Sequence, residues 1–185
     1  KIDYILEGNK YYDILGADED VPEDKFEKIG QQEKIGNELI NAALYGRNAA
    51  VKHLLDTGAP VDYRNSAGNC ALIVACYDGR ISTMKLLLDH GADINIQDAY
   101  GRTALLWSSI YRNTGIIRFL LDHGADPNIQ DRSGRSPLIS GVRGNCLSVV
   151  ELLVDHGADV NIQDADGYTP LVISLSHDMF GIAEF

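Results

Sequence analysis

The sequence predicts an all-α solenoid, in which antiparallel helix pairs stack on one another and are joined by β-hairpin-like fingers, with a short helical extension at the N-terminus. Two regularities predict this fold class. Glycine and aspartate each recur with a constant period of about 33 residues, and apolar runs with helical spacing recur between them. The glycines are Gly68, Gly101, Gly134 and Gly167, and the aspartates are Asp98, Asp131 and Asp164.

The repeat divides the chain into an acidic N-terminal extension and five units. The extension covers residues 1–31 and the repeats cover 32–185, with units at about 32–64, 65–97, 98–130, 131–163 and 164–185, the last one truncated. The first unit has Ile35 in place of the glycine and His53 in place of an apolar residue. Terminal units change in this way because one face has no neighbour. We expect the extension to cap this end with a helix that begins at a capping box of Asp20 and Glu23, and further repeats or another domain to follow the truncated unit.

The first helix of each unit is expected to begin after a residue whose side chain caps it. A cap accepts a hydrogen bond from an N–H group of the first turn that has no partner in the helix. The cap positions are Asn37, Cys70, Thr103, Ser136 and Thr169. Proline follows the cap at Pro137 and Pro170, which is the favoured order at a helix start. Because cysteine is a poor cap, Cys70→Thr is predicted to stabilise the protein.

The second helix of each unit is expected to bury a broad face. In the third unit Ile116, Ile117, Phe119 and Leu120 follow the i, i+1, i+3, i+4 pattern of such a helix. A glycine then ends the helix, because glycine adopts the left-handed conformation at little cost. These glycines are Gly91, Gly124 and Gly157.

These segments resemble the ankyrin repeat family over about residues 32–185. The resemblance is carried by GRTAL at 101–105, GRSPL at 134–138, GYTPL at 167–171 and three HGAD-x-N-I-Q-D turns that begin at His90, His123 and His156. It implies one hairpin finger and two antiparallel helices per unit. The histidine that follows TPL in the family is replaced by Ile40, Ile73, Leu106, Ile139 and Val172. We therefore expect the hydrogen bonds of that histidine to be missing.

The resemblance also implies a concave partner-binding face made by the fingers and the inner helices. By register, the candidate partner-binding residues are Tyr77, Asp78, Tyr100, Arg102, Tyr111, Arg132, Arg135, Arg143 and Tyr168. Tyrosine and arginine are the residue types that dominate interface hot spots, although they are also tolerated on a half-exposed helix side. Trp107 is expected in the core, because its register position is apolar in other units. The arginines suggest a partner segment with acidic or phosphorylated groups.

The function expected from these features is a non-catalytic protein–protein interaction module within a larger scaffold, adaptor or effector. The alternative is the recognition arm of an enzyme whose catalytic domain lies outside these residues. No catalytic residues, cofactor or metal ligands are predicted, because the chain has no G-x-S-x-G, phosphate-loop or H-E-x-x-H motif. The leader YYDILGADEDVPEDKFEKI also looks like the opening of a J-domain co-chaperone, but the HPD tripeptide of that family is absent.

Charge and composition limit the other classes of partner. The net charge of −11 disfavours nucleic acid and anionic membranes, which are bound by clustered lysine and arginine. No apolar stretch is long enough to insert in a membrane, and the three cysteines suit no disulfide framework. We expect a monomer in the cytoplasm, or in the host cytosol if the protein is an effector.

Overall fold

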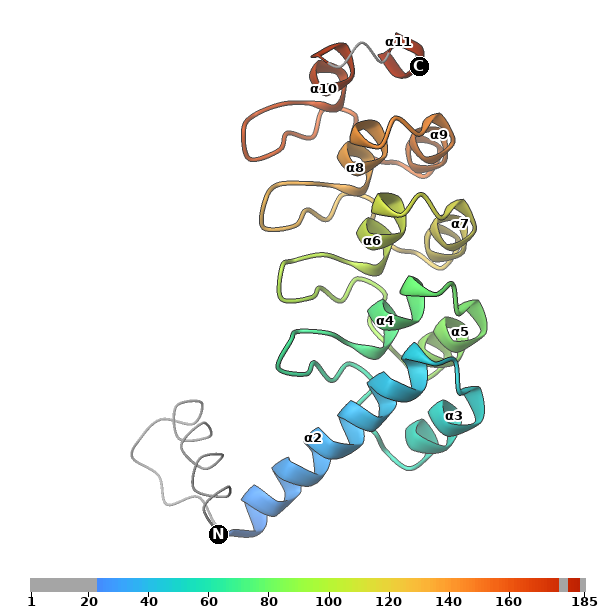
Figure 1. Cartoon of the computed structure of the whole chain (residues 1–185), viewed down its shortest axis with the longest axis vertical. Helices are drawn as coiled ribbons and strands as arrows, with labels where there is room; N and C mark the ends of the chain where they lie inside the picture. The colour runs from blue at the N-terminus through green and yellow to red at the C-terminus, as the bar shows by residue number, and fades with distance from the viewer. Residues whose placement is uncertain (1–22, 177–179, 184–185) are drawn as a thin grey trace. The chain divides into compact units, whose positions relative to one another are not determined.

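A computed structural model describes residues 23–176 and 180–183 as a series of helices (Figure 1). Residues 33–185 form a compact unit that holds the repeats. The expected cap residue Asp20 lies outside the described residues. The helices are α2 (Glu23–Leu44), α3 (Asn48–Asp56), α4 (Ala71–Tyr77), α5 (Ile81–Asp89), α6 (Ala104–Ile110), α7 (Thr114–Asp122), α8 (Pro137–Arg143), α9 (Leu147–Asp155), α10 (Pro170–Ser176) and α11 (Phe180–Ala183).

The helices of the repeats form two columns. The inner helices α4, α6, α8 and α10 pack on one another in sequence, while among the outer helices α3 packs on α5 and α7 on α9. A finger precedes each inner helix and extends to the left in Figure 1. Within the described residues the fingers contain no β-strand, and are loops closed by hydrogen bonds such as Asp98 N to Arg102 O at 2.9 Å. The prediction of an all-α solenoid is confirmed.

The first unit differs from the others because α2 runs without a break through Ile35. The corresponding residue in the next unit, Gly68, has a φ of +75°, a left-handed conformation that β-branched residues strongly avoid. Isoleucine therefore continues the helix where glycine would turn the chain. The prediction that Asn37 caps a helix is wrong, because this residue lies inside α2 and its Nδ2 donates to Glu33 O at 2.9 Å.

The predicted caps of the central inner helices are confirmed. The hydroxyl oxygens of Thr103 and Ser136 accept hydrogen bonds from Leu106 N and Ile139 N, each at 3.1 Å. Cys70 has the same extended backbone conformation, but its side chain makes no capping hydrogen bond. Helix α4 consequently starts with an uncapped first turn.

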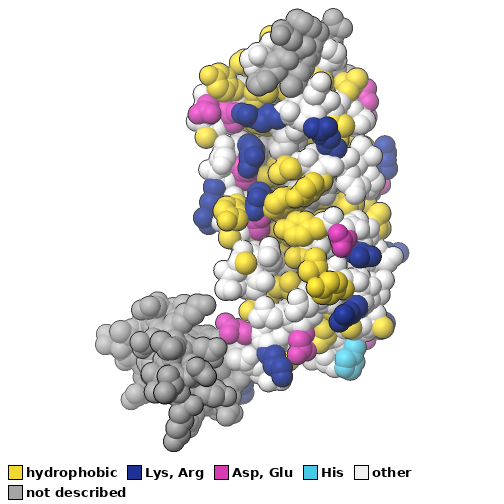
Figure 2. Space-filling model, viewed as in Figure 1, with side chains coloured by type: hydrophobic (Ala, Val, Ile, Leu, Met, Phe, Trp, Pro, Cys, Tyr) yellow, Lys and Arg dark blue, Asp and Glu magenta, His cyan; other side chains and the backbone are white. Residues whose placement is uncertain are grey.

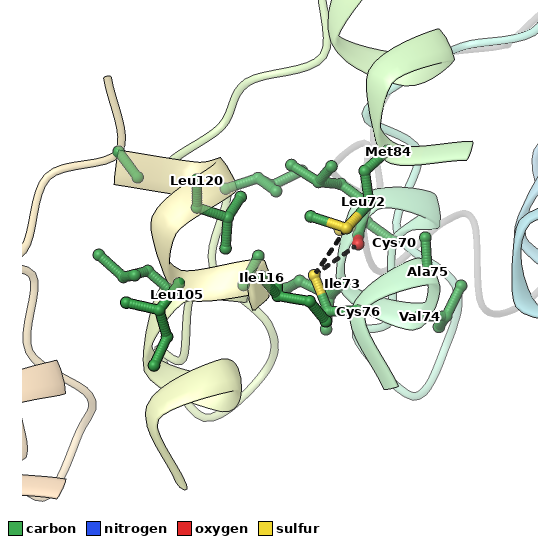
Figure 3. Close-up of a cluster of buried hydrophobic side chains, with 14 of the residues drawn as sticks. Cys70, Leu72, Ile73, Val74, Ala75, Cys76, Met84, Leu105, Ile116 and Leu120 are labelled. Atoms are coloured by element: carbon green, nitrogen blue, oxygen red, sulfur yellow. Dashed lines mark hydrogen bonds between the residues drawn. The ribbon is translucent and has the colours of Figure 1, made fainter. Parts of the chain in front are cut away.

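The core lies between the two columns of helices and continues from one unit to the next. Figure 3 shows one part of it, where side chains of α4, α5, α6 and α7 meet. Ile73, Leu106 and Ile139, which replace the family's histidine, are fully buried, so these units gain apolar packing where that histidine would make polar contacts. The Cys76 thiol donates to Leu72 O at 3.3 Å, and burial raises its pKa far above the ordinary value. This cysteine is therefore an unreactive core residue.

Candidate partner-binding face

The predicted site residues lie on one side of the repeats, which we call the inner face. It consists of the fingertips (65–69, 98–102, 131–135 and 164–168), the last residue of each inner helix, and the loops that join inner to outer helices. Figure 2 shows that hydrophobic side chains gather in the middle of the view over the inner helices, with lysine and arginine on both sides of them. The fold thus brings the aromatic and basic residues of separate units together.

Each fingertip is built around one polar side chain, which is buried in the three fingers that carry aspartate. In the third unit Asp98 Oδ1 accepts hydrogen bonds from Tyr100 N at 2.8 Å and Arg102 N at 2.9 Å. Asp131 and Asp164 accept the same pair of backbone hydrogen bonds in the next two fingers, and the uncharged Asn65 does so in the preceding one. The regular recurrence of aspartate along the chain therefore has a structural cause, which is closure of the finger.

The second oxygen of Asp98 organises the aromatic side chains. Asp98 Oδ2 accepts hydrogen bonds from Arg102 Nε at 2.9 Å and from Trp107 Nε1 at 3.1 Å. The Arg102 guanidinium lies 4.4 Å from the ring centre of Tyr100 and 4.0 Å from that of Trp107. These contacts combine an ion pair with two cation–π interactions. One buried carboxylate thus fixes the orientation of three side chains on the inner face.

Trp107 is also the centre of a row of rings on the inner face. Its ring stacks on Tyr111 with centroids 5.6 Å apart, and Tyr77 of the preceding unit meets it edge-on at 5.3 Å. Tyr111 remains 64% exposed and Tyr100 62% exposed, whereas Tyr77 is 39% exposed. Burial and the nearby Asp98 raise the pKa of Tyr77 to about 12, so its hydroxyl stays protonated at neutral pH. Trp107 is half-buried, and packs against the core as expected while also forming part of this surface.

Three of the four predicted arginines are paired within the protein. Besides the Arg102–Asp98 pair, Arg135 pairs with Asp131 at 2.9 Å and Arg143 pairs with Asp164 at 2.8 Å. Burial alone would raise the pKa of Asp164, but hydrogen bonds from Tyr168 N, Arg143 and Asp166 N outweigh it and lower that pKa. These arginines are therefore held as partners of buried aspartates, and replacing them would disturb the fingers.

The remaining predicted residues are exposed to solvent. Arg132 is exposed and its side chain makes no ion pair with any residue that the structure describes. Tyr168 is 50% exposed on the last finger. Asp78 pairs with Arg80 at 3.3 Å, and both side chains of this pair remain largely in solvent. Such exposed pairs contribute little stability.

Sequence reasoning missed a row of basic side chains in the loops between inner and outer helices. This row consists of Arg47, Arg80 and Arg112, one in each of three successive units. Arg47 lies 5.2 Å from the ring centre of Tyr45, which is itself 60% exposed. The signal that could have found the row is register, since Arg47 and Arg80 occupy the same position in successive units.

The histidines that follow the outer helices act at helix ends. The Nδ1 atoms of His90, His123 and His156 lie within 2.8 Å of the carbonyl oxygens of Leu86, Phe119 and Leu152, respectively. Each therefore binds a carbonyl of the last helical turn, as expected for residues at a helix C-terminus. No group of three or more potential ligands that could hold a metal occurs among the described residues.

The comparisons with known proteins agree with this arrangement. A family model described as ankyrin repeats in three copies matches residues 39–131, and a second model of many ankyrin repeats matches residues 120–173. The chain belongs to the ankyrin repeat family. Comparison with curated proteins gives no match. Ankyrin repeats are generally protein–protein interaction modules and are typically non-catalytic, and in the described part of this ankyrin-repeat chain no helix is long and apolar enough to cross a bilayer.

Proposed function

We propose that this ankyrin-repeat chain binds a partner protein through the inner face, as part of a scaffold, adaptor or effector that works in the cytoplasm. The observation that carries the proposal is the row formed by Tyr77, Trp107 and Tyr111. Its rings are held in one orientation by contacts with one another and by the hydrogen bond from Trp107 to Asp98, yet Tyr111 remains 64% exposed.

Fixed aromatic rings suit binding for two physical reasons. Each ring supplies a large apolar area that a partner can bury, and aromatic side chains are enriched among interface hot spots. Rings that are already ordered lose little conformational entropy when the partner arrives. The proposed anchors are therefore Tyr77, Tyr111 and Tyr100, supported from behind by Trp107, with Tyr168 and Arg132 at the edge of the contact.

Site-specific photo-crosslinking tests the proposal. A photoreactive phenylalanine analogue at position 111 replaces one exposed aromatic residue by another, and the same analogue at the exposed position 118 on outer helix α7 is the matched control. In extracts of the cells that make the protein, we expect position 111 to form a crosslink to a discrete partner and position 118 to form none. Crosslinks from position 118 alone would place the binding surface on the outer helices and refute the proposal.

A further inference from the structure

We propose that the partner segment bound by the inner face carries carboxylate side chains interspersed with apolar ones. This inference deepens the proposed function and rests on it. The occupant to which it commits is an extended acidic segment of another protein, lying along the row of rings with its carboxylates directed to the arginines on either side.

The distribution of charge over the repeats supports an acidic occupant. Among the described residues, the outer helices and the segments that follow them carry the acidic residues Asp56, Asp62, Asp89, Asp93, Asp122, Asp126, Glu151, Asp155 and Asp159, against the basic residues Lys52, Arg64, Lys85 and Arg118. The described residues of the inner face include the basic residues Arg47, Arg80, Arg102, Arg112, Arg132, Arg135 and Arg143, against the acidic residues Asp78, Asp98, Asp131, Asp164 and Asp166. A protein with a net charge of −11 therefore has one face with an excess of positive charge.

Burial increases this asymmetry at the surface that a partner meets. Asp98, Asp131 and Asp164 are only 5%, 7% and 7% exposed, respectively, and are covered by the arginines that pair with them. The outer acidic residues are exposed, and the Asp56 side chain remains 49% exposed although it pairs with Lys52. A negatively charged segment is consequently repelled by the outer surface and attracted by the inner face, which directs it to one side of the repeats.

The arrangement of the basic groups matches an extended segment. Arg47, Arg80 and Arg112 follow the loops on one side of the inner helices, while Arg132 lies on a fingertip at the other side. Figure 2 shows basic side chains on both sides of a central apolar strip. In an extended chain alternate side chains point to the same side, so apolar residues can cover the rings while the long glutamate side chains between them bend along the surface to the arginines at its edges.

The same arrangement favours carboxylates over phosphates. Phosphate groups are bound where several arginines converge on one point. Here Arg102, Arg135 and Arg143 already donate to buried aspartates, Arg80 donates to the exposed Asp78, and Arg47, Arg112 and Arg132 lie in separate units. Each of these dispersed groups suits a single carboxylate.

The backbone at Arg112 gives a second, independent indication. Its φ of +57° lies in the left-handed region, and the corresponding positions in the other units are Gly46, Gly79 and Asn145, at +63°, +68° and +48°. An arginine here is strained where glycine would be relaxed, and strained residues concentrate at functional sites. The Arg112 side chain also extends over Gly144, where an added Cβ would lie 3.1 Å from Arg112 Nε. Arg112 is therefore placed by the fold at the edge of the inner face despite its backbone cost.

The first experiment compares synthetic peptides by fluorescence anisotropy with the whole chain. Neighbouring helices lie roughly 8–10 Å apart, so three units extend over about 30 Å, which an extended peptide of about 10 residues spans at ~3.3 Å per residue. The probes are a peptide of alternating Glu and Tyr, the same peptide with Lys for Glu, and a Ser/Tyr peptide with enough phosphoserines to match the charge of the first. We expect the Glu peptide to bind at least about tenfold more tightly than the Lys peptide, and more weakly as salt is added. Equal binding of the Glu and Lys peptides, or tighter binding of the phosphopeptide than of the Glu peptide, would overturn the inference.

The second experiment separates a binding role of Arg112 from a structural one. Arg112→Gly removes the charge and relieves the left-handed strain, so we expect the denaturation midpoint to rise or stay level while affinity for the Glu peptide falls about two- to fivefold, the effect of one exposed ion pair. Arg132→Gln should cause a similar loss. Arg118→Gln, on the outer helix α7, removes the same charge away from the inner face and should leave affinity unchanged. If Arg118→Gln weakens binding as much as Arg132→Gln, the effect is one of net charge and the inference fails.

The outcome for the inference is distinguishable from the outcome for the proposed function. If no peptide shows the expected preference while a crosslink at position 111 still captures a partner, the acidic chemistry is wrong and the inner face remains the binding surface. If position 111 captures nothing and only outer positions crosslink, both proposals fall.

Discussion

Replacement of the buried carboxylate of Asp98 should disrupt the centre of the inner face. Asp98→Asn preserves the shape of the side chain and the Oδ1 atom, which can still accept from Tyr100 N and Arg102 N. It replaces Oδ2 by an amide group, which is a donor. Two donors, Arg102 Nε and Trp107 Nε1, then face another donor instead of an acceptor.

The size of the effect follows from these two lost contacts. A hydrogen bond to a charged group contributes about 1.5–3 kcal/mol, and both lost contacts are of this kind, so about 3 kcal/mol is the lower end of their sum. The Arg102 side chain is only 18% exposed, so water cannot fully replace the carboxylate. We therefore expect the free energy of unfolding to fall by about 3 kcal/mol.

Urea denaturation, followed by circular dichroism and by the emission of Trp107, the single tryptophan of the chain, measures this change. Asp166→Asn, on an exposed fingertip, should change the stability by less than about 0.5 kcal/mol. Asp131→Asn keeps the backbone contacts of Oδ1 but removes the equivalent ion pair with Arg135 in the next unit, so it should lower stability without altering Trp107 emission in the folded protein. If Asp98→Asn unfolds at the same urea concentration as the parent, with unchanged emission, the role assigned to Asp98 is refuted.

Three further predictions concern the frame of the repeats. Cys70→Thr should raise the urea midpoint, because the hydroxyl of the introduced threonine can accept from Ile73 N and cap α4. We expect the free energy of unfolding to rise by about 0.5–2 kcal/mol, and a lower midpoint would contradict the cap geometry. Ser140→Ala should add about 1 kcal/mol in the same assay, because the buried Ser140 hydroxyl has no hydrogen-bond partner among the described residues; a loss of stability would show that it has one. Hydrogen bonds with Leu86 O and Asp56 raise the pKa of His90 above its ordinary 6.5. The stability that the charged imidazole provides is therefore complete below about pH 6.5 and is lost as the pH rises through the raised pKa. His90→Gln should remove this part of the pH dependence of stability, and an unchanged dependence would contradict the prediction.

Many fingers and helix caps of the repeats could be predicted, because they depend on local chemistry that repeats along the chain. The period of the glycines indicated the fingers, and Thr103 and Ser136 were recognisable as caps from their place before an apolar run. The continuous helix α2 could not be foreseen in the same way. Register suggested that Asn37 caps a helix. The isoleucine at position 35, where later units have glycine, has the stronger effect because it keeps the backbone helical.

The position of the inner face was predictable from the sequence, but the contacts of its side chains were less so. Register predicted that Tyr100 and Tyr111 share one surface, because the units after the first fold alike. The pairing of Arg102 with Asp98 lies within one finger and could have been read from their i, i+4 spacing. The pairing of Arg143 with Asp164 joins two units and depends on how these pack, which no local pattern reports.

The claim that the inner face binds the partner is tested most directly by nuclear magnetic resonance on the whole chain. The partner captured from position 111 would be titrated into the 15N-labelled protein, and amide shift changes mapped onto the repeats. The account predicts that the largest changes fall in the fingertips 98–102 and 131–135 and in the loops around Arg80 and Arg112, together with the indole signal of Trp107. Largest changes in the outer helices α5, α7 and α9, with the Trp107 signal unmoved, would contradict it.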